Sequence, residues 1–111
     1  MELKKIENPK ILYELEVNCF PNPLSFQAIQ SYCTGKQYKS FFIHEEAQPI
    51  SYAITMEIPN DCELIRFGTI RQYRRQGKAL LFLEKLREHY LERKFQVMFL
   101  EVAKANKAGR S

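Results

Sequence analysis

The sequence contains only three cysteines and two histidines, and their spacing suits neither cross-links nor metal binding. Cys19, Cys33 and Cys62 are odd in number, lie far apart and include no Cys-x-x-Cys pair, so they predict neither a disulfide framework nor a zinc centre. His44 and His89 have no cysteine or carboxylate in a metal-ligand arrangement. We therefore expect free, reduced, partly buried thiols and no bound metal.

Long apolar runs, low-complexity tracts and internal repeats are also missing. No segment reaches the roughly 18 consecutive apolar residues of a membrane span, and no long apolar stretch follows the amino terminus. We therefore expect no membrane association and a cytoplasmic location. A chain of 111 residues is long enough for one domain with a modest core, so residues 1–111 are expected to form a single domain.

The charge balance is mildly basic. A net charge of +4 and a pI of about 9.0 suit an acidic ligand such as a phosphorylated cofactor. The excess is too small to require a nucleic acid, and we expect no direct nucleic-acid partner.

Two helices are expected to precede a sheet. Asn8-Pro9 is typical of a helix start, and the helix is expected to end at Pro21. Ser25 is expected to cap a second helix that runs to residue 31, with Phe26 and Ile29 facing inward, and Gly35 ends this region.

The second half of the chain predicts a mixed sheet. Residues 40–44, 50–58 and 62–70 are apolar or alternating runs separated by polar turns, which favours an antiparallel meander. Residues 77–93 have helical periodicity and lead to an apolar run at 95–102. That last strand should lie parallel to residues 62–70 after a right-handed crossover. The fold class is therefore α/β (α+β), with a mostly antiparallel sheet flanked by helices.

The most informative segment joins the 62–70 strand to this long helix. Its sequence is Arg-Arg-Gln-Gly-Lys-Ala at residues 74–79. Backbone NH groups of such a loop, the helix dipole and two arginines together suit a diphosphate, so a nucleotide-like cofactor is expected. The loop lacks the Lys-Ser or Lys-Thr ending of nucleoside-triphosphate loops and the three glycines of a dinucleotide fingerprint. A solvated basic turn is the alternative interpretation.

The loop satisfies the shorter pattern Arg/Gln-x-x-Gly-x-Gly/Ala, with Gly77 and Ala79 at the small positions. In this it resembles the acetyl-CoA pyrophosphate loop of the GNAT acetyltransferases. The chain also resembles one GNAT subfamily, the bacterial ribosomal-protein-alanine N-acetyltransferases, from about residue 11 to its end. The segments that carry this second resemblance are residues 19–25, 51–55, 73–77 and 100–102, with Asn106.

The resemblance implies acetyl-CoA as co-substrate and the α-amino group of a ribosomal protein, on an amino-terminal alanine, as acceptor. It implies a general base at Glu101, which would accept a proton from the acceptor's ammonium group. From the pattern alone, Glu101 either points to solvent on an alternating strand or lines a site. The residues implied to bind the cofactor are Phe67, Gly68, Thr69, Arg74, Arg75, Gln76, Gly77, Lys78, Ala79, Leu80 and Asn106.

Two of these positions have a second interpretation. Lys78 either adds charge near the phosphates or points to solvent, with solvent slightly favoured. Asn106 either contacts the cofactor or caps a helix. Family members also continue past the position of Ser111, with a general-acid tyrosine in the next element, so the resemblance implies a carboxy-terminally incomplete domain whose activity is reduced or absent.

Two other functions are compatible with the sequence. One is a small basic RNA-binding module, in which Arg71, Tyr73, Arg74, Arg75 and Lys78 form an electrostatic and stacking patch. The other is a catalytically inactive protein that still binds coenzyme A or a partner.

Overall fold

The computed structural model describes residues 2–59 and 61–97, and its five strands form one sheet. In spatial order, the strands are β1 (Lys4–Lys5), β2 (Tyr38–Glu45), β3 (Gln48–Ile58), β4 (Asp61–Thr69) and β5 (Gln96–Val97). Neighbours from β1 to β4 are antiparallel, whereas β5 is parallel to β4. The expected meander and the parallel crossover are confirmed, and β1 is an addition that the sequence did not predict.

The helices begin where local capping residues allow. These elements are α1 (Pro9–Cys19), α2 (Phe26–Thr34), the 3-10 turn η1 (Arg71–Tyr73) and α3 (Lys78–Glu92). The Asn8 side chain accepts a hydrogen bond from the Lys10 NH at 2.9 Å, and Ser25 Oγ accepts one from the Ala28 NH at 3.1 Å. Both expected helix starts are therefore confirmed.

The second helix is longer than expected. It continues to Thr34, three residues past the predicted end, and Gly35 follows as its C-cap. The Ser31 and Thr34 hydroxyls donate hydrogen bonds to carbonyl oxygens of the preceding turn, at 2.7 Å and 3.2 Å. These residues therefore do not break the helix.

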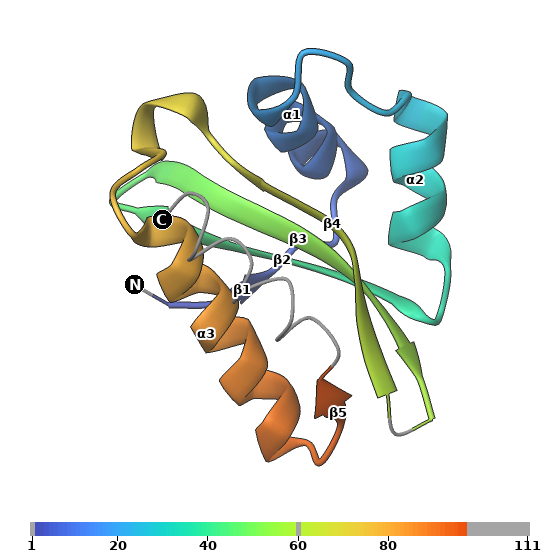
Figure 1. Ribbon diagram of the computed structural model, residues 1–111. Coiled ribbons are helices and arrows are strands. Elements are labelled where there is room, and N and C mark those ends of the chain that lie inside the picture. Colours follow the sequence, from blue (N-terminus) through green and yellow to red (C-terminus); the bar gives the residue numbers. More distant parts are fainter. Residues whose placement is uncertain (1, 60, 98–111) are drawn as a thin grey trace.

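Two apolar cores lie on opposite faces of the sheet. Helices α1 and α2 cover one face, and α3 crosses the other (Figure 1). Residues 52–54 of β3 alternate between them, since Tyr52 and Ile54 pack toward α1 and α2 while Ala53 packs toward α3. Ile29 is buried in the first core as expected, but Phe26 is 36% exposed and only meets Tyr13 edge to face. The inward orientation expected for Phe26 was wrong because α2 buries only Ile29.

Candidate functional site

The loop between β4 and α3 combines a short turn with two left-handed residues. It runs through η1 and reaches Gly77, which precedes the first residue of α3. Gly77 has φ 76° and Arg75 has φ 62°. A side chain at position 77 would have open space but would force a strained backbone, because L-residues rarely adopt this conformation. The chain therefore requires glycine at this position for its backbone and not for its packing.

The start of α3 presents unpaired donors. No side chain caps the helix, and the first α-helical hydrogen bond is from the Leu81 NH to the Gly77 carbonyl at 3.1 Å. Within the described residues, the backbone NH groups of residues 75–80 have no protein acceptor. These donors, together with the positive end of the helix dipole, form a site suited to an anion.

The charge around the loop agrees with that chemistry. Between Glu63 and Glu84 the sequence has five cationic side chains and no carboxylate. Arg71, Arg75 and Gln76 are exposed, whereas Ala79 and Leu80 are half-buried in the first turn of the helix. Gln76 donates its side-chain amide back to the Gln72 carbonyl at 3.0 Å, which ties the loop to η1. A diphosphate fits this set of donors and charges.

Arg74 anchors the loop to two other elements. Its Nε donates to the carbonyl of Thr69, the last residue of β4, at 2.9 Å. Its terminal nitrogen donates to the carbonyl of Cys19, the last residue of α1, at 2.6 Å. Helix α1 has no basic residue in its own last turn, so Arg74 supplies a cation to its carbonyl end.

Lys78 does not point to solvent, so that expectation was wrong. Its side chain is 18% exposed, and its ammonium forms a salt bridge with Glu45 in the β2–β3 hairpin. The same ammonium lies 4.9 Å from the centroid of the Tyr73 ring. Lys78 thereby fixes the beginning of α3 to the β2–β3 hairpin.

The neighbouring part of β4 is tightly packed on both faces. Phe67 stacks on Phe82 of α3, with ring centroids 5.9 Å apart. A Cβ atom on Gly68 would lie 2.9 Å from the Cys19 Cβ atom and about 3 Å from the Phe20 ring, so glycine is needed here for space. Thr69 shares a 2.9 Å hydrogen bond with the buried Ser51 hydroxyl.

Cys19 lies against Gly68, but its thiol is a poor nucleophile. The thiol is buried, and burial raises its pKa to about 12. Cys19, Cys33 and Cys62 are all free, as expected. Among the residues that the structure describes, no group of His, Cys, Asp and Glu side chains could hold a metal ion.

A buried carboxylate that the sequence did not single out lies beside the same strand. Glu16 of α1 is fully buried and accepts hydrogen bonds from the Leu24 NH at 2.7 Å and from the Tyr52 hydroxyl. Arg66 of β4 binds both of its oxygens, at 2.5 and 3.2 Å, and stacks 3.8 Å above the Phe20 ring. Glu16 thus fixes the connection between α1 and α2 against the sheet.

The ionisation of this cluster follows from its partners. Burial alone would raise the pKa of Glu16, but the hydrogen bonds from Arg66, Tyr52 and Leu24 outweigh it and hold the pKa below its usual value. Burial and the Glu16 carboxylate raise the pKa of the Tyr52 hydroxyl. The Tyr52 ring is fully buried and its hydroxyl donates to Glu16, so Tyr52 acts as a packing residue.

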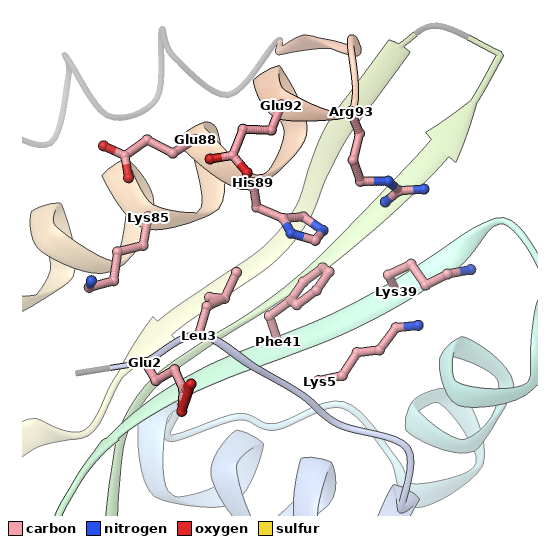
Figure 2. A pocket seen from close by; sticks show the side chains of 10 residues that line it. All are labelled: Glu2, Leu3, Lys5, Lys39, Phe41, Lys85, Glu88, His89, Glu92 and Arg93. Carbon is pink, nitrogen blue, oxygen red and sulfur yellow. The ribbon is translucent and has the colours of Figure 1, made fainter.

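A recess of about 600 Å³ lies at the other end of α3. Figure 2 shows Lys5, Lys39 and Phe41 on its sheet side and His89 and Glu92 on its helix side. Both acidic and basic side chains line it, so the recess carries no single sign of charge. It is separate from the loop at residues 74–80, which lies at the amino end of the helix.

Two of the expected site residues, Glu101 and Asn106, lie outside the described residues. No helix in the part of the chain that the structure covers is long and apolar enough to cross a membrane.

The sequence from the first helix onward matches a known family. Residues 10–111 fit the model of the acetyltransferase (GNAT) family, and the chain belongs to that family. No curated protein sequence matches it significantly.

Solved structures share the fold at low sequence identity. The ribosomal-protein-S18-alanine N-acetyltransferase of Escherichia coli superposes with a TM-score of 0.74 and 22% identity, over 83% of this chain and 60% of that one. GCN5 of Tetrahymena gives 0.72 and 14%, over 87% and 68%. An aminoglycoside antibiotic 6'-N-acetyltransferase of Acinetobacter haemolyticus gives 0.64 and 14%, over 100% and 91%. This chain therefore spans 60% of the length of the E. coli enzyme.

Proposed function

We propose that this chain is an acetyl-CoA-dependent N-acetyltransferase and that residues 74–80 bind the diphosphate of the coenzyme. The observation that carries the proposal is the uncapped start of α3, where the NH groups of residues 75–80 have no acceptor among the described residues. Membership of the GNAT family supports the choice of acetyl-CoA as the anion.

The remaining roles that we propose are those that the family resemblance implies. Acetyl-CoA supplies an activated acetyl thioester. The backbone of Phe67, Gly68 and Thr69 would orient the pantetheine arm, and a backbone NH of this segment would stabilise negative charge on the thioester oxygen. Glu101 would accept the proton of the acceptor's ammonium group, and Asn106 would contact the coenzyme. An α-amino group has a pKa of about 8, so little assistance is needed at neutral pH.

The acceptor we propose is the α-amino group of a polypeptide, with a ribosomal protein that begins with alanine as the first candidate. The E. coli relative carries that activity in its name, whereas other relatives are aminoglycoside acetyltransferases. Aminoglycosides carry several ammonium groups and require carboxylates in their site. The segment of α1 and α2 nearest to Gly68 offers none, because no residue between Glu16 and Lys36 is charged.

Acetyl transfer to defined acceptors tests this function. The chain is incubated with acetyl-CoA and either an alanine-starting peptide, the same peptide with a blocked amino terminus, or an aminoglycoside, and the released thiol is followed. We expect release with the free peptide alone, and its loss in Glu101→Gln. If the chain binds the coenzyme but releases no thiol with any acceptor, its function is coenzyme binding without catalysis. Release with the aminoglycoside alone would overturn the acceptor assignment.

A further inference from the structure

We propose that Arg74 and Arg75, although adjacent, divide the work of the loop: Arg74 positions it, and Arg75 contacts the phosphate. The inference rests on the proposed coenzyme function. It departs from the simpler view that both arginines attract the diphosphate.

Arg74 is already committed to the protein. Both sides of its guanidinium donate to carbonyl oxygens, one at the end of β4 and one at the end of α1, at 2.9 and 2.6 Å. A planar guanidinium held by two carbonyls in this way has a fixed orientation. The residue therefore connects the loop to β4, which precedes it in the sequence, and to α1, which lies 55 positions away.

The second of these contacts explains why the anchor matters for the site. Cys19 and Phe20 lie against Gly68, and the Glu16 carboxylate holds the same end of α1 onto the sheet. Arg74 thus ties the loop to a junction that is itself rigid. The direction of the NH groups of residues 75–80 is set before any ligand binds, which reduces the ordering cost of binding.

Arg75 has the opposite character. Both arginines are exposed, but within the described residues the Arg75 guanidinium has no hydrogen-bond or ion-pair partner. Lys78 is occupied by Glu45. Arg75 is therefore the cation of residues 74–80 that can bind an incoming phosphate without first breaking a contact in the protein.

Glutamine separates the two roles. The side-chain nitrogen of glutamine can occupy the place of the arginine Nε, so Arg74→Gln keeps the hydrogen bond to Thr69 while losing the charge and the bond to Cys19. Arg74→Ala loses the charge and both hydrogen bonds. At position 75, both Arg75→Gln and Arg75→Ala lose the charge that we assign to the phosphate contact.

The experiment measures acetyl-CoA affinity by titration calorimetry, at low and at physiological salt, together with the melting temperature of the ligand-free proteins. We expect both Arg75 variants to bind about tenfold more weakly at low salt, with a difference from wild type that shrinks as salt rises, and to melt like wild type. We expect Arg74→Ala to bind about tenfold more weakly at both salt concentrations and to melt lower. Arg74→Gln keeps one of the two anchoring bonds, so its affinity should fall between wild type and Arg74→Ala, with a difference from wild type that does not shrink as salt rises.

Other outcomes overturn the proposal. If Arg74→Gln binds as weakly as Arg74→Ala and its defect fades with salt, Arg74 contacts the phosphate directly. If Arg74→Ala binds acetyl-CoA as tightly as wild type, the Arg74 side chain does not position the loop. Should Arg74→Ala fail to fold, the matched pair Arg74→Gln and Arg75→Gln decides by the same criteria. If wild type does not bind acetyl-CoA, the coenzyme function and this division both fail, while a low melting temperature confined to the Arg74 variants would still establish the anchor.

Discussion

Replacing Glu16 with glutamine tests the buried junction beneath the candidate site. Each oxygen of the carboxylate accepts hydrogen bonds from Arg66 and from one further donor, the Tyr52 hydroxyl on one side and the Leu24 NH on the other. The amide NH2 of glutamine would face an Arg66 nitrogen, which is also a donor, in either orientation, so the variant loses at least one bond from Arg66 together with the ion pair.

The size of the effect follows from the burial of both partners. Breaking a fully buried ion pair costs roughly 3–5 kcal/mol. The Arg66 side chain keeps 27% of its surface exposed and can recover water, so we expect the free energy of unfolding to fall by about 2–3 kcal/mol. For a domain of this size the melting temperature should drop by roughly 10 °C.

The pH dependence gives the sign of the interaction. The folded pKa of Glu16 lies below 4.5, so its stabilisation is present at neutral pH and is lost as the pH falls below 4.5. The gap between wild type and Glu16→Gln should therefore narrow on acidification. The assay is thermal unfolding followed by circular dichroism, with the exposed Glu14→Gln on the same helix as control. A Glu16→Gln variant that melts with Glu14→Gln at neutral pH would refute the proposed role of the cluster.

Three further substitutions probe the loop and its surroundings. Gly68→Ala places a Cβ within 3.1 Å of three side chains, so the free energy of unfolding in urea should fall by about 1–3 kcal/mol. Unchanged stability would mean that the neighbouring side chains can move to make room. In Gly77→Ala the alanine must adopt φ 76°, so the free energy of unfolding should fall by about 1 kcal/mol. The variant should also bind acetyl-CoA more weakly in calorimetry, and wild-type affinity would contradict the backbone role of this glycine. Lys78→Met removes the salt bridge to Glu45, which is 45% exposed, and should lower stability by less than about 1 kcal/mol at low salt and by less at high salt; a loss independent of salt would point to packing instead.

The features that the sequence could predict are those determined by near neighbours. The Asn8 and Ser25 caps and the glycine ahead of α3 each depend on residues a few positions apart. The basic loop was found for the same reason, since its donors, its glycine and its helix are contiguous.

The features that were missed depend on pairs far apart in the chain. Glu16 meets Tyr52 and Arg66 across 36 and 50 positions, so nothing local marked it as buried. Arg74 reaches Cys19 across 55 positions, and Lys78 reaches Glu45 across 33, so each found a protein partner that spacing could not indicate. The two-residue strand β1 is likewise defined only by its pairing with Phe41 and Phe42.

Thermal stability with and without the coenzyme decides whether the loop before α3 binds the diphosphate of acetyl-CoA. A ligand that binds only the folded state stabilises it by about 2.7 kcal/mol at a hundredfold excess over Kd. We predict a clear rise in melting temperature with acetyl-CoA and none with S-acetyl-pantetheine, which has the thioester arm but no diphosphate. No rise with acetyl-CoA in a folded sample would contradict the proposed coenzyme site and favour the RNA-binding alternative.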